Sequence, residues 1–256
     1  MKRKIIYYKD EINDDFSGVK RKTIKIDKNY NYIKRNVVWG LCSFFLYRVV
    51  MKPFAWLYMK IKYSHNIKNK SVLRMYKDKG YFVYSNHVLI DGDAFVPNLI
   101  DFNKKTYIVV HPDNLSVPIT KTFLEMNGAF PLPATIEAGK NFLFAMEEFL
   151  GRNSMITIFP EAHIWPYYNQ IRPFPSGSFK YPIKFDKPVY VITNTLHKRK
   201  FLKIPKVITF VDGPFFVDKS LNKKDQVEDL RNKVYEVMCE RSKNGNYQYI
   251  EYIKEN

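Results

Sequence analysis

Short runs of β-branched and aromatic residues recur between residues 81 and 211, and each is bounded by Gly, Pro, Asn or Asp. Such runs are typical of buried strands. The expected strands are residues 81–84, 107–110, 155–159, 189–193 and 207–211. Apolar side chains at helical spacing predict two amphipathic helices, over residues 135–150, with Thr135 as the N-cap, and 225–241. This alternation predicts an α/β domain with a largely parallel central sheet flanked by helices.

The pattern ahead of this domain is different. Residues 1–36 are polar and charged, and they lack the apolar core of a signal peptide. Residues 37–59 are mostly apolar, but Arg48, Lys52 and Pro53 interrupt them. Neither half therefore reaches the ~20 mostly uncharged residues that a spanning helix needs. We expect an N-terminal helical hairpin over residues 37–62 that lies in a membrane interface.

The flanks of this apolar segment support an interfacial position. Lys34, Arg35, Lys60 and Lys62 suit anionic lipid, and the aromatic residues suit headgroup depth. An ordinary buried hairpin and one long tilted transmembrane helix are the alternatives. The expected organisation is a polar segment 1–36, a membrane-associated hairpin 37–62 and an α/β domain 63–256.

Composition limits the class of partner. The chain has 256 residues, of which 46% are hydrophobic, so it can bury a sizeable core. Its 42 Lys and Arg against 25 Asp and Glu give a net charge of +17. This surplus favours a polyanionic partner, such as an anionic bilayer, an acidic carrier protein or a phosphorylated substrate. Nucleic acid is disfavoured, because its recognition motifs are absent and the aromatic residues sit mostly in apolar runs.

Cysteine spacing gives no sign of a metal site. Cys42 and Cys239 each sit in an apolar setting, and we expect both to be buried free thiols. There is no CxxC, no His/Cys cluster and no Gly-rich phosphate-binding loop in the sequence. We therefore expect neither a metal nor a nucleotide cofactor.

The strongest candidate for catalysis follows the first expected strand. Residues 85–93 present His87 with two carboxylates, Asp91 and Asp93, close behind. Histidine is suited to take a proton near neutral pH, and a nearby carboxylate orients its ring and stabilises the protonated form. The alternative is that Asp91 and Gly92 simply form a turn.

Later segments strengthen the enzymatic interpretation. Residues 128–133 form an apolar turn stiffened by proline, and the strand over residues 155–159 ends in Pro160 and Glu161. Arg172 leads into a turn of small residues that ends at Lys180, and Pro188 then opens the next strand.

This ordered set resembles the glycerolipid acyltransferase family of the 1-acylglycerol-3-phosphate acyltransferase type. That family carries Asn-His-x4-Asp after a strand, a Gly-containing turn near an Arg, a Phe-Pro-Glu-Gly strand end and a later segment opened by proline. Here Asn86-His87 and Phe159-Pro160-Glu161 match directly, and Pro188 falls where the fourth segment begins. The resemblance covers roughly residues 54–211.

The resemblance implies an acyltransferase at the cytoplasmic face of a membrane. It implies transfer of an acyl group from acyl carrier protein or coenzyme A to a hydroxyl of a lysophospholipid-like acceptor, with the thioester as co-substrate and no other cofactor. His87 is the implied general base, which activates the acceptor directly without an acyl-enzyme. The expected substrate-binding residues are Asn86, Glu161, Arg172 and Lys180, with bracing of its own loop as the alternative for Glu161.

Three departures from the family pattern matter. Gly92 holds the position of the family's Asp, and we favour Asp93 over Asp91 as its replacement, because apolar residues follow it and a one-residue insertion in a loop costs little. Asp91 has its own claim, since on a regular helix it would lie on the face of His87. Pro133 stands near the family's Arg, so phosphate recognition has to come from elsewhere; the candidates are Lys121, Lys140, Arg172 and Lys180. Ala162 replaces Gly, and it is strained if the backbone there requires a positive φ.

Two other functions compete with acyl transfer. One is a non-catalytic basic protein that binds membrane or nucleic acid, which the charge supports. The other is a Ser-His-Asp hydrolase, but the sequence has no Gly-x-Ser-x-Gly, and residues 176–178 are a poor substitute for it.

Overall fold

A seven-stranded sheet forms the centre of the protein. The computed structural model describes residues 4–18, 22, 24–116 and 118–255. The strand order is β2-β8-β7-β3-β6-β4-β5. The strands are β2 (Asn66–Lys68), β3 (Tyr81–Ser85), β4 (Thr106–Val110), β5 (Ala129–Pro131), β6 (Met155–Ile158), β7 (Val189–His197) and β8 (Lys206–Phe215). Every neighbouring pair is parallel except β7 and β8, so the prediction of a largely parallel sheet is confirmed.

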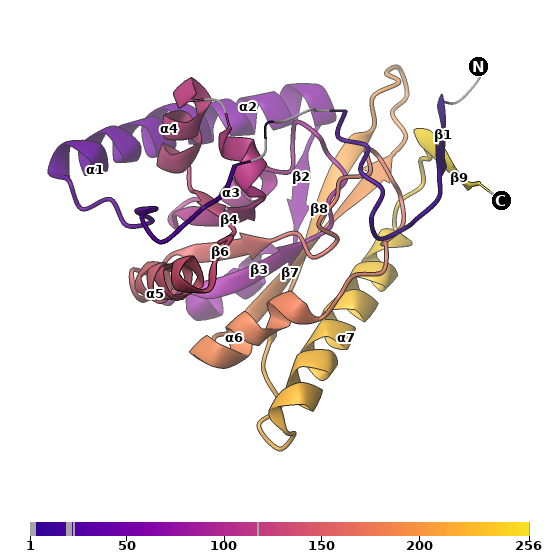
Figure 1. The fold of residues 1–256 in the computed structure, drawn as a ribbon. Helices are drawn as coiled ribbons and strands as arrows, with labels where there is room; N and C mark the ends of the chain where they lie inside the picture. Colours follow the sequence, from indigo (N-terminus) through magenta and orange to yellow (C-terminus); the bar gives the residue numbers. More distant parts are fainter. Residues whose placement is uncertain (1–3, 19–21, 23, 117, 256) are drawn as a thin grey trace.

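Helices cover both faces of this sheet (Figure 1). One layer holds α5 (Ile136–Gly151), α6 (Lys180–Phe185) and α7 (Lys223–Ser242), and the other holds α1 (Val37–Phe44), α2 (Lys52–Tyr63), α3 (Val96–Ile100) and α4 (Pro118–Met126). Strand β3 is buried throughout, and its side chains alternate between the two layers. Phe82 and Tyr84 pack into the core beneath α5 and α7, whereas Tyr81 and Val83 pack into the core beneath α2 and α3.

The expected helical hairpin is wrong, because α1 and α2 form one helix. A π-helical turn (Phe45–Met51) joins them, and the whole helix runs from Val37 to Tyr63. Arg48 and Lys52, the two cations that interrupt the apolar segment, point to the domain and form hydrogen bonds with main-chain carbonyl groups. Arg48 donates to the carbonyls of Phe102 and Asn103, and Lys52 donates to that of Phe102 at 2.7 Å. Pro53 lies inside this continuous helix, just after the π-helical turn, and it interrupts the main-chain hydrogen bonds there without ending the helix.

The outward face of this helix is apolar and exposed. One stripe packs on the domain through Ala55, Met59 and Tyr63, each at most 2% exposed. The other side carries exposed Val37, Val38, Leu41, Phe44, Phe45, Val49, Val50, Phe54, Trp56, Leu57 and Ile61. By length and composition the helix could cross a membrane. Cys42 is exposed on it and Cys239 is half-buried, so the expectation of two buried thiols is wrong.

The two ends of the described chain meet in a second, small sheet. Strand β1 (Lys4–Tyr8) pairs in parallel with β9 (Ile250–Lys254), and Figure 1 shows them side by side at one end of the molecule. Aromatic rings attach this sheet to the domain, since Trp165 stacks on Tyr252 at 4.9 Å and its indole N–H donates to the carbonyl of Asp14. Neither short strand was expected from the sequence.

Candidate active site

His87 and Asp93 form a hydrogen-bonded pair just beyond the end of β3. His87 Nδ1 lies 2.7 Å from Asp93 Oδ2. The Asp93 side chain is 4% exposed, whereas the His87 side chain is 24% exposed, so one partner is buried and the other reaches the surface. The His87 ring rests against Phe159, which follows the neighbouring strand β6, with 4.6 Å between ring centroids. Within the described residues, His87 Nε2 makes no hydrogen bond, so it can receive a proton from a substrate.

A tight turn brings Asp93 back to the histidine. The Asp93 N–H donates to the carbonyl of Leu89 at 2.9 Å, and the Leu89 N–H donates to Asp93 Oδ2 at 2.8 Å. Burial raises the pKa of Asp93, while the hydrogen bonds from His87 and from the amides of Leu89 and Val88 lower it. The extra residue of the loop is absorbed in this turn. The structure therefore places Asp93, and not Asp91, against His87.

Asp91 serves a different contact. It accepts hydrogen bonds from Tyr58, Lys62 and Tyr63 of α2, and Tyr63 Oη lies 3.1 Å from Tyr167 Oη. Burial by itself raises the pKa of Asp91, but the hydrogen bonds from Lys62 and the two tyrosines outweigh it and leave the pKa below its usual value. Asp91 thus ties the His87 loop to the long helix.

Asn86 is buried and braces the strand ends. Its side-chain amide donates to the carbonyl of Asn194 at 3.0 Å, and its Oδ1 accepts the Asn194 N–H at 2.8 Å. This reciprocal pair joins the end of β3 to β7. With both ends of the amide engaged and the residue 1% exposed, Asn86 is placed to position His87 and not to touch substrate.

Glu161 and Arg172 also brace the site from beneath. Glu161 accepts the backbone N–H of His87 and that of Arg172, each at 3.1 Å. Arg172 lies 3.5 Å from the same carboxylate and donates to the carbonyls of Glu11 and His163. Both side chains are at most 1% exposed. The expected substrate contacts of Arg172 and Glu161 are therefore corrected, because neither side chain reaches the surface.

The backbone of the turn after Glu161 is strained at Ala162. Ala162 has φ +61°, in the left-handed region. The amides of Ala162 and His163 donate to the carbonyls of Phe159 and Glu161 within the turn. These two amides are thus engaged and do not form an oxyanion hole in this conformation.

Among the described residues, no hydrogen bond or ion pair joins the remaining cation candidates to His87 or Asp93. Lys180 is exposed at the start of α6, with its Nζ over the Tyr181 ring at 5.6 Å. Lys140 is exposed on α5, and Lys121 on α4 lies over Tyr30 at 5.5 Å. Substrate binding by Lys180 stays a prediction. In the part of the chain that the structure describes, no group of three or more His, Cys, Asp or Glu could hold a metal ion.

Three buried polar residues behind Asp93 were missed from the sequence. They are Asn194 on β7, Thr209 on β8 and His65 at the end of α2. The polar run Thr193-Asn194-Thr195 inside an otherwise apolar strand was the available signal, because buried polar groups need partners.

Comparison with known proteins leaves the family open. No family model matches this chain, and no curated protein is significantly similar to it. Among solved structures, the crystal structure of the 1-acyl-sn-glycerophosphate (LPA) acyltransferase PlsC from Thermotoga maritima is similar, with 14% sequence identity and a TM-score of 0.49. The match covers 80% of this chain and 85% of that one. Similarity at this level does not decide what this chain does.

Proposed function

We propose that this protein is an O-acyltransferase of the membrane surface. It moves a fatty acyl group from acyl carrier protein or coenzyme A to a hydroxyl of a lysophospholipid-like acceptor at the cytoplasmic face of a membrane. The observation that carries the proposal is the His87–Asp93 pair, in which a buried carboxylate holds Nδ1 at 2.7 Å and leaves Nε2 open. This is the arrangement a general base requires.

The reaction follows from this geometry. His87 Nε2 takes the proton of the acceptor hydroxyl as its oxygen attacks the thioester carbonyl. The carbon–sulfur bond then breaks, and the imidazolium returns the proton to the leaving thiolate, so ester and free thiol are formed. Asp93 keeps the N–H on Nδ1 and stabilises the imidazolium between these steps.

Direct attack by the acceptor is favoured over an acyl-serine. No serine hydroxyl among the described residues bonds to His87. In the sequence candidate for a nucleophile turn, residues 176–178, Ser176 Oγ donates to Glu228 at 2.5 Å, and the buried Ser178 hydroxyl has no hydrogen-bond partner among the described residues. A Ser-His-Asp hydrolase therefore lacks its nucleophile in this arrangement.

The long helix supports a membrane-surface location. Its exposed apolar residues run from Val37 to Ile61. The flanking cations have partners within the protein: Lys34, Arg35 and Lys62 pair with Glu125, Glu148 and Asp91, and Lys60 donates to the carbonyl of His65. Contiguous exposed apolar surface of this kind marks an interaction site. Because the other stripe of the helix is packed on the domain, we place the helix in the plane of the interface.

A thiol-release assay on the full chain tests this function. The protein in detergent or anionic vesicles receives acyl-coenzyme A or acyl carrier protein thioester, with or without a lysophospholipid acceptor. The proposal expects free thiol to appear only when the acceptor is present. Release without the acceptor would indicate a hydrolase. Salt-sensitive binding of lipid or nucleic acid without turnover on either donor would indicate a non-catalytic binding protein.

A further inference from the structure

A chain of buried hydrogen bonds extends behind Asp93, away from His87. Asn194 Nδ2 lies 3.5 Å from Asp93 Oδ1, and Thr209 Oγ1 donates to Asn194 Oδ1 at 2.6 Å. His65 Nε2 lies 2.8 Å from the same Thr209 oxygen. All four side chains belong to residues that are at most 3% exposed. Asn194 and Thr209 are direct partners across β7 and β8, so the sheet register itself holds the middle of the chain.

The direction of each hydrogen bond follows from the protons available. A carboxylate only accepts, so Asn194 turns its N–H group to Asp93 and its oxygen to Thr209. Thr209 gives its one hydroxyl proton to that oxygen, and its lone pair therefore accepts an N–H from His65 Nε2. Burial, assisted by the charge of Lys60, lowers the pKa of His65 to about 4, so the ring is neutral near neutral pH. The contact of Nε2 with a hydroxyl that gives its own proton to Asn194 then assigns the single ring proton to Nε2. Every donor in the chain points toward Asp93.

We propose that Asn194, Thr209 and His65 are positioning residues that fix the Asp93 carboxylate against His87. Hydrogen bonds aligned in one direction polarise one another, and donors to a carboxylate favour its charged form. The chain thus favours the ionised form of Asp93, against the burial that raises the pKa of this carboxyl, and holds the carboxylate in one orientation. This inference rests on the proposed role of His87 as general base.

A second His–Thr pair, on β7, provides a matched control. Thr195 Oγ1 lies 2.9 Å from His197 Nε2 and donates to the carbonyl of Ile208 at 2.9 Å. Thr195 is buried like Thr209, but side chains alternate along a strand, so it lies on the opposite face from Asn194. This pair ends on a main-chain carbonyl and does not reach Asp93.

The test compares Thr209→Val with Thr195→Val. Each substitution removes a buried hydroxyl at nearly constant shape. The readouts are the low-field proton NMR resonance of His87 Nδ1–H, and kcat and KM for acyl transfer. We expect Thr209→Val to shift or broaden the resonance and to lower kcat about five- to tenfold with KM unchanged. Thr195→Val should leave the resonance and kcat unchanged.

Two variants of His65 keep the test decisive if Thr209→Val does not fold. His65→Gln retains an N–H that can reach Thr209 and should behave as the natural protein, whereas His65→Leu should resemble Thr209→Val. The inference is overturned if Thr209→Val and Thr195→Val give the same resonance and kcat, or if the two His65 variants do. The proposed function still stands in that case, provided that His87→Ala is inactive. Activity in His87→Ala overturns the proposed function. In that case the His87 Nδ1–H resonance, compared between the natural protein and Thr209→Val, still tests the hydrogen-bond chain behind Asp93.

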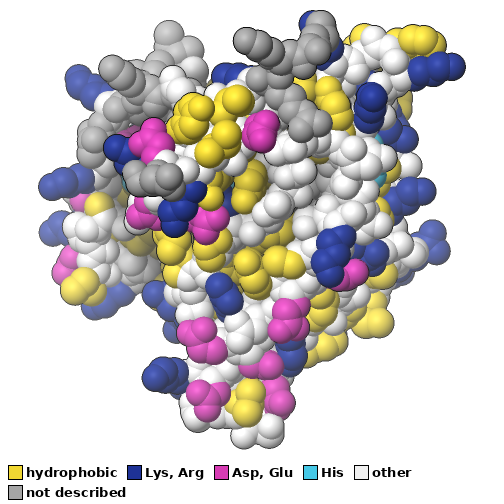
Figure 2. Space-filling model, turned by 90° about the vertical axis from the view of Figure 1, so that its right-hand side faces the viewer, with side chains coloured by type: hydrophobic (Ala, Val, Ile, Leu, Met, Phe, Trp, Pro, Cys, Tyr) yellow, Lys and Arg dark blue, Asp and Glu magenta, His cyan; other side chains and the backbone are white. Residues whose placement is uncertain are grey.

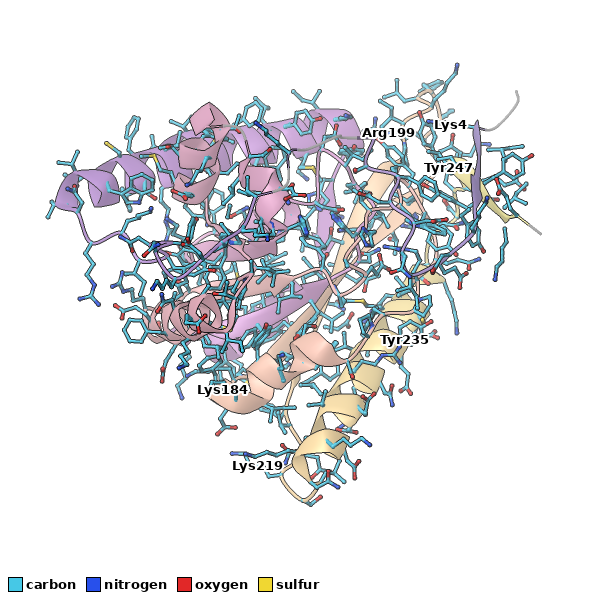
Figure 3. The ribbon with its side chains drawn as sticks, viewed as in Figure 1. Lys4, Lys184, Arg199, Lys219, Tyr235 and Tyr247 are labelled. Atoms are coloured by element: carbon cyan, nitrogen blue, oxygen red, sulfur yellow. The ribbon has the colours of Figure 1, made fainter. Side chains whose placement is uncertain are left out.

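The loop between β7 and β8 supports a second, independent inference. Phe201 and Leu202 at its tip are 86% and 57% exposed. The same loop carries four cations, Lys198, Arg199, Lys200 and Lys203. Figure 1 shows the loop rising past the end of α2, and Arg199, labelled in Figure 3, donates to Ser64 at the C-cap of α2.

We infer that this loop is a second contact with an anionic bilayer, beside the long helix. An exposed aromatic and an exposed aliphatic side chain surrounded by cations match the apolar interior and anionic headgroups of such a surface. The loop also continues the exposed face of α2, which ends at Ile61, 71% exposed. Figure 2, which faces the side of the molecule that carries β1 and β9, shows Asp and Glu interspersed with Lys and Arg over that face.

Vesicle co-sedimentation tests the loop. The probe is vesicles of equal parts phosphatidylglycerol and phosphatidylcholine, and the variant carries Phe201→Ser and Leu202→Ser. We expect about tenfold weaker partitioning than for Phe216→Ser, a control 53% exposed beyond the other end of β8. Equal partitioning of the two variants overturns this inference alone. Failure of the natural protein to bind these vesicles overturns it together with the proposed membrane location.

Discussion

His87 Nδ1 and Asp93 Oδ2 lie 2.7 Å apart, and the same carboxylate oxygen accepts the N–H of Leu89 at 2.8 Å. The loop that carries Asp93 therefore folds back on itself to bring the carboxylate under the histidine ring. This contact leaves Asp91 free to bind the long helix through Tyr58, Lys62 and Tyr63. The two neighbouring carboxylates thus have separate tasks.

Asp93→Asn and Asp91→Asn should separate these tasks. Asp93→Asn removes the acceptor that fixes the His87 ring, and we expect kcat to fall by about a hundredfold or more. Asp91→Asn should change kcat less than about threefold but lower the free energy of unfolding by about 1 kcal/mol, because hydrogen bonds to α2 are weakened. Steady-state kinetics and denaturant unfolding check both results. A larger loss of kcat in Asp91→Asn than in Asp93→Asn would contradict the assignment of Asp93 as the partner of His87.

Ala162→Gly should stabilise the protein. Ala162 is exposed and has φ +61°, so glycine relieves strain without loss of packing. We expect the free energy of unfolding to rise by about 1 kcal/mol. Ala134→Gly is the control, since Ala134 is also exposed outside a helix but is not among the residues of positive φ. A loss of stability in Ala162→Gly equal to that of the control would contradict this account of the turn.

Acid should destabilise the protein partly through His65. Its pKa is about 4 in the fold against the ordinary 6.5, so between these values the unfolded chain binds more protons. Stability should therefore fall as pH drops from about 6.5 to 4, by up to roughly 3 kcal/mol from this group. His65→Gln should flatten that part of the stability profile. The control is His197→Gln, where His197 is half-buried, and it should flatten the profile less.

Charges on the outer face of the long helix should release the protein from membranes. Val38→Asp with Leu41→Asp places two anions on side chains that are now 68% and 67% exposed, so the fold should tolerate them. We expect binding to anionic vesicles to fall at least about tenfold. Phe144→Asp is the control, because Phe144 is 56% exposed on α5, in the opposite layer. Equal effects of the helix pair and the control would argue against an oriented interface.

Most of the sheet was predictable, because β3, β6 and nearly all of β7 are buried apolar runs with clear bounds, whereas the three-residue strands β2 and β5 were not predicted. The histidine and its two carboxylates were visible for the same reason, as polar residues directly after the buried strand β3. The sequence did not reveal that Arg48 and Lys52 find carbonyl partners across the domain, so two cations and a proline suggested a break in a continuous helix.

Long-range polar pairing was the other part that the sequence concealed. Glu161 and Arg172 looked like surface groups for substrate, but the turn that follows β6 buries them against each other. Asn194 and Thr209 meet only because β7 and β8 pair in one register, and His65 reaches them from the end of α2. The short strands β1 and β9 carry no strong pattern and form only where the two ends of the chain meet.

The most direct test of the central claim is acceptor-dependent thiol release by His87→Ala beside His163→Ala. His163 lies in the neighbouring turn and does not bond to Asp93 or His87 in the described structure, so its loss should leave activity within about twofold. The account predicts that His87→Ala folds normally and loses at least about a hundredfold in kcat. Acceptor-dependent release at the natural rate in folded His87→Ala would contradict it.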